Sequence, residues 1–368
     1  MKQLLPVFLL MVIAFTGCKK DTNTQPYPDA RIEVVLNEIP FTTETNLRIG
    51  YALKTWEYEK DGLKLVTIIV MNQNNTELAQ YQAGDFRRIY KNPITPSPFF
   101  QWSTLDSYYI SIQLPIDLNA TPPASLNHQL VFEDTIQNKE VILKGGSFTP
   151  RYSESPLIIA SPVKGERLLF INQSTSLYHF DALIFLNDEV YGPERFAFDN
   201  VQYNNTYTDI YTGDPTVNTS YDIYGDTIYA VAAGTIEKVT DGRPENHGNQ
   251  ADVVFHSANE YAGNYLIQKI GTDRYAYYCH IIPGKIFVSA GDQVTEGQPL
   301  ALLGNSGNST APHLHFHVAD GVEFWTSHGI PIVLKKYTKT GDAFTGPVSP
   351  YEVQNAMMEE TTMVTIDN

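Results

Sequence analysis

Residues 304–317 read GNSGNSTAPHLHFH, in which His313, His315 and His317 alternate with two apolar residues. Alternate side chains of an extended strand project from the same face, so we expect the three imidazoles to line one surface. The small, polar, glycine-rich residues before them favour a tight loop. A neutral imidazole binds zinc well, and a second one nearby can move protons near neutral pH. We therefore interpret the strand as part of a metal or catalytic site; one or two structural histidines on a polar strand face are the simpler alternative.

The N-terminal residues have the layout of an export signal followed by a tether. The apolar run over residues 4–15 is shorter than the ~20 residues of a membrane-spanning helix and is typical of a secretory signal. Residues 16–18 (TGC) resemble a bacterial lipoprotein processing site. We expect residues 1–17 to be a lipoprotein signal peptide, Cys18 to be lipidated and residues 18–29 to form the tether. The protein would then be anchored to a membrane of the cell envelope through this lipid only, exposed to the periplasm or the exterior; ordinary cleavage and secretion is the alternative.

The charge balance excludes one class of partner. The formal net charge is −16, with 41 acidic residues against 25 Lys and Arg. Nucleic-acid binding requires clustered Lys and Arg to contact phosphates, so we expect no nucleic-acid partner. The only other cysteine is Cys279, which leaves a lipidated chain no intramolecular disulfide.

Residues 30–155 have an all-β pattern. The segments 31–36, 63–70 and 108–114 are rich in β-branched and aromatic residues and are separated by turn-forming residues. Short strands at this spacing predict a sandwich that resembles an immunoglobulin-like domain. Its single histidine, His128, is interpreted as a surface or packing residue.

Residues 156–337 are predicted to form a second domain of short strands, which makes the fold class all-β throughout. Residues 290–301 are predicted to be a hairpin whose glycines mark the bends. Such hairpins also occur in biotinyl- and lipoyl-carrier domains, but those need a modifiable lysine, and none lies between Lys285 and Lys335. Residues 338–368 are assigned to a C-terminal extension that ends in a last strand or a loose tail.

Residues 294–318, together with 227–234 and 275–281 (YAYYCHI), resemble the lysostaphin/LytM-type zinc metallopeptidase family. The resemblance covers roughly residues 156–335. It implies a LytM-type antiparallel β domain (the duplicated hybrid motif fold), one Zn²⁺ ion and hydrolysis of peptide bonds in bacterial cell-wall peptidoglycan.

The resemblance also implies roles for individual residues. His315 and Asp199 match zinc ligands of the family, and His313 and His280 match its two catalytic histidines. Zinc with three protein ligands keeps a position for water, lowers the pKa of that water and polarises the scissile carbonyl. One imidazole can accept the proton of the water, and another can stabilise the oxyanion and protonate the departing amine. Which of the two histidines does which stays open.

The sequence departs from the family at the first ligand. Arg195 stands where the family has the histidine of His-x-x-x-Asp, and a guanidinium offers no lone pair to a metal. The candidate replacement is His179, on a strand predicted over residues 178–186 that forms a hairpin with residues 195–199. A loop of three or five residues would place His179 and Asp199 on one face, with Cβ atoms roughly 5–8 Å apart. A two-residue loop would place them on opposite faces unless a bulge intervened.

A subset of the family resembles this chain in a histidine on the preceding strand, an Arg-Phe-Ala-x-Asp segment, a segment like residues 241–246 (DGRPEN) and a HLHFH ending. We therefore interpret the protein as a zinc-dependent metallopeptidase of cell-wall peptidoglycan, with peptidoglycan peptides as its substrate. The proposed zinc ligands are His179, Asp199 and His315. The alternative is a catalytically inactive LytM-like envelope lipoprotein that binds peptidoglycan or regulates another wall hydrolase, in which Arg195 marks the lost activity.

Three further residues lie near these motifs. His317 stands where the family usually has a glutamate and either supports the ligands or is exposed at the strand end. His247 either lines the rim of the cleft or is solvated. Cys279 is expected to point away from the face of its neighbour His280 and to be a packed thiol.

Overall fold

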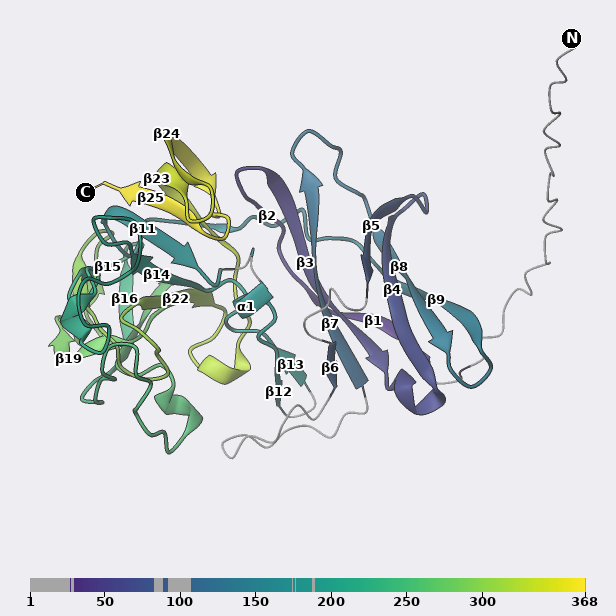
Figure 1. Cartoon of the computed structure of the whole chain (residues 1–368), viewed down its shortest axis with the longest axis horizontal. Helices are drawn as coiled ribbons and strands as arrows, with labels where there is room; N and C mark the ends of the chain where they lie inside the picture. The colour runs from purple at the N-terminus through teal and green to yellow at the C-terminus, as the bar shows by residue number, and fades with distance from the viewer. Residues whose placement is uncertain are drawn as a thin grey trace, which may run out of the picture.

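The computed structural model describes residue 27 and residues 30–82, 89–91, 107–173, 175, 177–186 and 189–367. The predicted signal peptide, Cys18 and nearly all of the tether lie outside these residues. The described part is almost entirely β and forms two bodies side by side (Figure 1). Within it, no helix has the length and hydropathy needed to span a membrane.

The N-terminal body is a two-layer β sandwich. One sheet has the order β1-β3-β7-β6, with β2 paired to β3, and the other has the order β5-β4-β8-β9. The inner faces share one core that includes Tyr51, Ile68, Ile110 and Phe132. The two-layer arrangement agrees with the predicted sandwich, while its immunoglobulin-like character stays a prediction. Its elements are β1 (Ile32–Asn37), β2 (Phe41–Thr42), β3 (Asn46–Trp56), η1 (Tyr58–Asp61), β4 (Leu63–Asn72), β5 (Glu77–Gln82), β6 (Ile89–Lys91), β7 (Ser107–Asp117), β8 (Leu126–Asp134) and β9 (Lys139–Phe148).

The first sheet of the sandwich is covered on both faces. Along β3, residues such as Tyr51 point into the sandwich core, whereas Ala52 points to the opposite face. On that opposite face, Ala52 and Tyr109 pack against Leu183 and Phe185. These two residues belong to the segment that contains α1 (Leu177–Phe180), β12 (Ile184–Leu186) and β13 (Glu189–Tyr191). The segment therefore lies between the two bodies (Figure 1).

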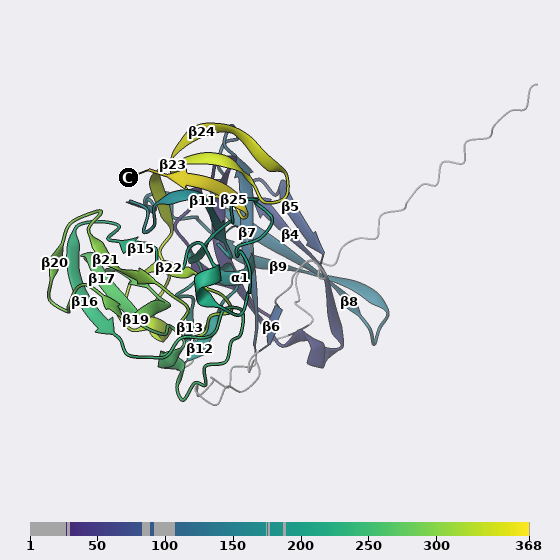
Figure 2. The same cartoon turned by 60° about the vertical axis from the view of Figure 1, so that its left-hand side comes forward.

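The C-terminal body is built on a long, mixed sheet and a smaller one (Figure 2). The long sheet has the order β10-β23-β25-β11-β14-β22-β18-β17-β16-β20, with β24 paired to β23, and the smaller has the order β15-β21-β19. The elements are β10 (Leu157–Ile159), β11 (Gly165–Ile171), β14 (Phe198–Gln202), η3 (Asn218–Ser220), β15 (Thr227–Tyr229), β16 (Gly234–Thr240), η4 (Ala258–Glu260), β17 (Tyr265–Gly271), β18 (Arg274–Tyr278), β19 (Ile281–Ile286), β20 (Gln293–Val294), β21 (Pro299–Leu303), β22 (Leu314–Ala319), η5 (Phe324–Thr326), β23 (Ile332–Asp342), β24 (Gly346–Ala356) and β25 (Thr362–Ile366).

The predicted hairpin at residues 290–301 is wrong. β20 pairs with β16 in the long sheet, whereas β21 pairs with β15 and β19 in the smaller one. The chain crosses between the sheets because both strands bury apolar residues, Val294 and Leu300, in the shared core. The Gly297 N–H donates to the Ala230 carbonyl at 2.8 Å, which holds the turn between β20 and β21 against the residue that follows β15.

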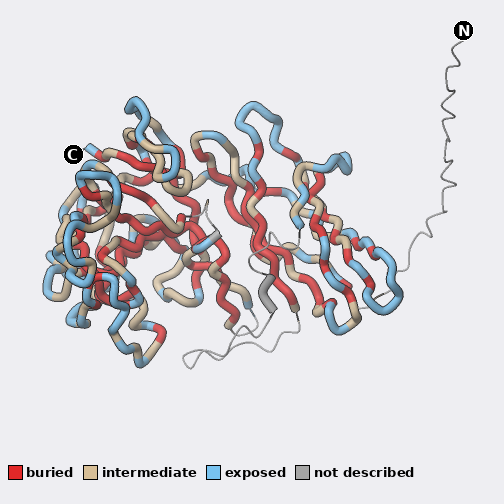
Figure 3. The backbone as a smooth tube through the Cα atoms, in the orientation of Figure 1, coloured by how far each residue is buried: buried red, intermediate tan, exposed pale blue. Residues whose placement is uncertain are grey.

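The end of the chain belongs to the long sheet. The predicted boundary between the second domain and the C-terminal extension, at residue 337, falls inside β23. Further along, β25 pairs with both β11 and β23. Val364 is fully buried there. Of the two alternatives left open for the end, it is the last strand that forms. Figure 3 shows that buried residues concentrate in the central strands of both bodies.

Candidate metal centre

Strand pairing places Asp199 directly beside His315. β14 and β22 are antiparallel neighbours in the middle of the long sheet, and their register opposes these two residues. Nδ1 of His315 lies 3.0 Å from Oδ1 of Asp199, and both side chains are buried. Leu314 and Phe316 point to the other face of β22 and enter the apolar core. The period of two predicted from the sequence thus holds along this strand.

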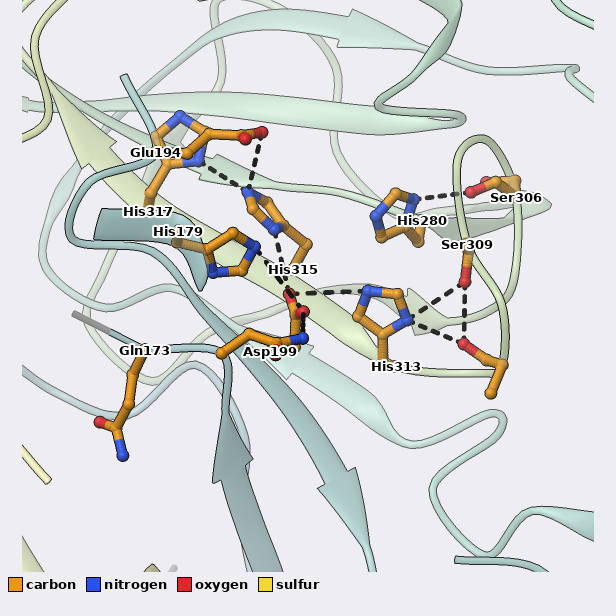
Figure 4. Close-up of polar contacts among 12 residues, drawn as sticks. Gln173, His179, Glu194, Asp199, His280, Ser306, Ser309, His313, His315 and His317 are labelled. Carbon is orange, nitrogen blue, oxygen red and sulfur yellow. Dashed lines mark hydrogen bonds and ion pairs between the residues drawn. The ribbon is translucent and has the colours of Figure 1, made fainter. Parts of the chain in front are cut away.

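His179 reaches the same point from α1. Its Nε2 lies 3.8 Å from Oδ2 of Asp199, and its ring stands nearly perpendicular to that of His315, with centroids 4.9 Å apart. One ligand atom from each of the three residues lies within 4.8 Å of the other two. Figure 4 shows the three side chains converging.

The predicted route to this arrangement is wrong. His179 lies in a helical turn rather than on a strand, because α1 ends before β12 begins. Leu186 pairs with Glu189, the register that was expected to place His179 and Asp199 on opposite faces of a hairpin. Asp199 lies in β14, which pairs with β11 and β22 and not with β12. The contact between His179 and Asp199 is therefore tertiary and does not come from a hairpin.

The three residues fit a zinc ion. Two imidazole nitrogens and one carboxylate oxygen are a common zinc ligand set, and bonds of ~2.0–2.1 Å at tetrahedral angles place ligand atoms about 3.3 Å apart. Nδ1 of His315 lies 3.0 Å from Oδ1 of Asp199, Nε2 of His179 lies 3.8 Å from Oδ2, and one ligand atom from each residue lies within 4.8 Å of the others, so small side-chain shifts bring the set to this spacing. Nδ1 of His179 is also buried without a hydrogen-bond partner among the described residues. The second oxygen of Asp199 accepts a hydrogen bond from Nδ2 of Asn172 at 2.8 Å, which orients the carboxylate.

Electrostatics at the site keep Asp199 ionised, the state in which a carboxylate binds a metal. Burial disfavours the charged form of Asp199, but the positive potential of His179, His313 and His315 outweighs it and holds the pKa of Asp199 well below its usual range. Burial lowers the pKa of His179 despite the nearby Asp199. At His315, burial is outweighed by the hydrogen bond to Asp199 and by the charge of Glu194, so the pKa is raised.

His280 and His313 form a matched pair beside the three candidate ligands. Nδ1–H of His280 donates to the Ser306 carbonyl at 2.7 Å, and Nδ1–H of His313 donates to the Ala311 carbonyl at 2.8 Å. Each ring therefore keeps a lone pair on Nε2, and Nε2 of His313 lies 3.6 Å from Asp199. The ring centroids are 4.6 Å apart. Burial lowers the pKa of His280 well below its usual value, so this ring is neutral near pH 7.

Residues 218–324 match the family model described as peptidase family M23. The chain carries an M23 peptidase domain. His280, His313 and His315 lie within the matched residues, whereas His179 and Asp199 precede them.

Two curated relatives of this domain are the peptidoglycan DD-endopeptidases ShyA and ShyB of Vibrio cholerae. They are 35% identical over 85 residues and 38% identical over 77 residues. The matches cover 23% and 21% of this chain and 19% and 18% of the relatives. The chain thus spans less than a fifth of the length of the relatives it matches.

Two solved structures are similar to this chain. The catalytic domain of lysostaphin from Staphylococcus simulans has a TM-score of 0.22 and 20% identity, over 35% of this chain and 95% of that chain. A zinc-containing peptidase from Vibrio cholerae has a TM-score of 0.21 and 16% identity, over 78% of this chain and 81% of that chain. At these TM-scores the two likenesses carry no conclusion about the site.

His317 is fully buried beside the candidate ligand His315, so the predicted alternative of exposure is wrong. Its ring stacks on Tyr277 with centroids 4.4 Å apart, because the register of β18 and β22 opposes the two residues. Its Nδ1 lies 3.1 Å from Nε2 of His315. If Nδ1 of His315 held the metal, Nε2 would carry the proton and His317 would accept it, which would orient the ligand ring.

A cleft of about 470 Å³ opens beside the histidines. The candidate ligands and both catalytic candidates line it, and Tyr178, Tyr261, Phe324 and Trp325 add aromatic surface. Cys279 also lines it, although it was expected to point away from the face of His280. Burial raises the pKa of its thiol well above the usual value, which keeps it protonated and makes it a poor nucleophile or ligand.

Sequence reasoning missed the role of Asn246 at the end of the DGRPEN segment. Its Nδ2 lies within hydrogen-bond distance of the carbonyl oxygens of Asn305, Gly307 and Ser309, at 2.9, 2.8 and 3.1 Å. Its Oδ1 accepts from the Val253 N–H at 2.9 Å. Asn246 therefore holds the loop that precedes the histidine strand; the segment itself was the signal that could have pointed to it.

Two other predicted residues lie away from the candidate ligands. His247 is exposed and pairs with Asp252, with Nδ1 2.7 Å from the carboxylate, so the solvated alternative is the one observed. Arg195 is buried but points away from the metal centre toward Glu38 of the sandwich.

Proposed function

We propose that this protein is a zinc-dependent metalloendopeptidase that hydrolyses peptide bonds in bacterial cell-wall peptidoglycan. The observation that carries the proposal is the convergence of His179, Asp199 and His315 beside His280 and His313 at the base of one cleft. The M23 domain supports peptidase chemistry. The names of ShyA and ShyB support peptidoglycan as the substrate class.

Each residue has a defined part in this chemistry. His179, Asp199 and His315 would hold the zinc ion, which when bound lowers the pKa of a water ligand and polarises the scissile carbonyl. His280 and His313 each present Nε2 as a proton acceptor, because their Nδ1–H groups are engaged by backbone carbonyls. One ring accepts the proton of the attacking water at Nε2. The other enters the cycle protonated at Nε2 by solvent, stabilises the oxyanion and gives this proton to the departing amine; the first ring returns the proton of the attacking water to solvent at the end of the turnover.

The cleft walls suit an extended peptide. Tyr178 is exposed at the rim, and Tyr261 and Trp325 pack edge to face with centroids 5.9 Å apart. Such rings cover apolar parts of a substrate and exclude water from the reacting groups. We further propose that the lipid on Cys18 anchors the protein in the cell envelope, where it meets the wall; this part rests on the sequence of residues 16–18 alone.

The test measures zinc binding and wall cleavage on the same purified protein. We expect one zinc per chain and release of peptide fragments from purified sacculi. His313→Ala should retain zinc but lose cleavage, because His313 is one of the two proton-transferring rings and is not among the three ligands. His179→Ala should lose both. His247→Ala serves as the matched control, because this ring is exposed and paired only with Asp252 among the described residues.

Two results would contradict the proposal in different ways. A wild-type protein that takes up no zinc would exclude the metallopeptidase. Zinc binding without cleavage of any sacculus preparation would favour the inactive, peptidoglycan-binding alternative, which a sacculus pull-down would then examine.

A further inference from the structure

The metal centre depends on a short element that cannot hold itself in place. α1 consists of the four residues Leu177–Phe180. A single helical turn is unstable alone, because nucleation fixes several dihedral angles for one hydrogen bond. The position of His179 must therefore come from what this turn packs against.

Arg195 is the first of these contacts. Its Nη1 donates to the carbonyl of Phe180 at 2.6 Å, one residue after His179. The guanidinium also lies 3.9 Å above the centre of the Phe180 ring. Arg195 thus fixes both the backbone and the side chain at the end of α1.

Arg195 is held in turn by the N-terminal sandwich. Nε donates to Oε1 of Glu38 at 2.6 Å, and Nη1 donates to Oγ of Ser111 at 3.0 Å. Nη2 lies 3.5 Å from the carbonyl of Tyr51. Arg195 is 1% exposed, so these partners replace its entire hydration.

The sandwich surface is also shaped to receive α1. A Cβ atom on Gly50 would lie 2.9 Å from Cε2 of Phe180, closer than side chains approach. On the other side, a Cβ atom on Gly192 would lie 2.2 Å from Cδ of Arg195. Glycine at these two positions lets β3 and the Arg195 side chain pack tightly around Phe180.

We propose that Arg195 is a positioning residue of the metal centre, and that the sandwich, through Glu38 and Ser111, is a part of that centre because it holds the turn that carries His179. Arg195, which stands where the family has a histidine ligand, therefore positions His179, the residue that replaces this ligand. This inference rests on the proposed function for the ligand role of His179.

The test compares zinc affinity in the purified full-length protein by competition with a chromophoric chelator. We expect Glu38→Gln to weaken zinc binding roughly 10- to 100-fold, as loss of an outer partner of a ligand typically does. Glu296→Gln is the matched control, because Glu296 pairs with Lys335 at the surface, and it should bind zinc as the wild type does.

A double variant separates positioning from stability. Glu38→Gln leaves the Arg195 charge unpaired and is expected to lower Tm, but Glu38→Leu with Arg195→Met removes both charges and should restore Tm. If Arg195 positions α1, zinc affinity stays at least tenfold below wild type in the double variant. This variant also keeps the inference testable if Glu38→Gln does not fold.

The outcomes are distinct from those of the proposed function. Wild-type affinity in the folded Glu38→Gln variant, or in the double variant, would overturn the positioning role. Absence of zinc from the wild type would instead overturn the proposed function, and the role of Arg195 with it.

Discussion

At the scale of single residues, His317 controls the tautomer of a candidate ligand. Its Nδ1 lies 3.1 Å from Nε2 of His315, and its ring stacks on Tyr277. His317→Phe keeps an aromatic ring on Tyr277 but removes the hydrogen-bond acceptor. We expect zinc affinity to fall roughly 10- to 100-fold with Tm nearly unchanged, measured by chelator competition and thermal unfolding.

The control for this prediction is His247→Phe, on an exposed ring. Unchanged zinc affinity in His317→Phe would mean that Glu194, whose Oε1 lies 3.6 Å from Nε2 of His315, orients the ligand without help from His317.

The sequence predicts some residues of the site well and others not at all. The shared face of His313, His315 and His317 follows from the period of two along a strand, which is a local property. The burial of His317 depends on Tyr277 in a neighbouring strand, so no local pattern contains it. Arg195 could be recognised as unable to bind metal, but its partner Glu38 is 157 residues away.

At the scale of elements, Asn246 holds the loop before β22 through three carbonyl oxygens and one N–H. Asn246→Ala removes these bonds and takes away the acceptor of the Val253 N–H, whereas the Asn305 and Gly307 carbonyls keep backbone N–H donors. Because the amide has two N–H groups and one acceptor oxygen, we count three bonds, and at ~0.5–1.5 kcal/mol per bond we expect a loss of about 1.5–4.5 kcal/mol in unfolding free energy. The loop supplies the Ser306 and Ala311 carbonyls that orient His280 and His313, so kcat should fall by up to about 100-fold with zinc retained.

Denaturant unfolding and sacculus cleavage check this prediction, with Asn249→Ala as the matched control. Asn249 lies three positions later in the same segment and is exposed. Equal kcat in the Asn246 and Asn249 variants would show that the loop keeps its shape without the side-chain amide.

The type of a secondary-structure element could be predicted where its residue pattern is long, and the prediction was wrong where the pattern is short. The strand predicted over residues 63–70 lies within β4, where β-branched residues dominate. The strand predicted over residues 178–186 divides into α1 and β12. Four residues carry too little local preference to decide between helix and strand, so packing against Gly50 and Arg195 decides it.

At the scale of the whole molecule, the two bodies share a buried interface rather than a linker. Gly50 and Ala52, on the outer face of β3, are small and leave room for the segment that packs there. The ion pair between Glu38 and Arg195 connects the two bodies across this interface. The sequence analysis did not identify β3, and the segment that covers its outer face lies more than a hundred residues later in the chain, so no local pattern predicts the interface. Stability of the sandwich should therefore be coupled to the metal centre.

His128 makes that stability depend on pH. The ring is fully buried in the sandwich, with Nδ1–H donating to the Gly146 carbonyl at 3.1 Å and Nε2 2.9 Å from the Tyr51 hydroxyl. Burial lowers the pKa of His128 to about 4, whereas in the unfolded chain it is ~6.5. Between these values the unfolded state binds the proton and the folded state does not. The contribution of His128 is therefore complete above pH ~6.5 and is lost as pH falls toward 4, by about 3 kcal/mol in total.

The measurement is the urea-unfolding free energy of wild type and His128→Gln between pH 7 and pH 4. Other buried histidines, such as His280 and His317, also have lowered pKa values, so the wild-type profile alone cannot be assigned. The glutamine amide can still hydrogen-bond but does not titrate, and the difference between the two profiles isolates His128. We expect the wild type to lose up to about 3 kcal/mol more than the variant across this range. Parallel profiles would mean that His128 accepts its proton without unfolding the sandwich, as would follow if the Tyr51 hydroxyl and the ring separate in acid.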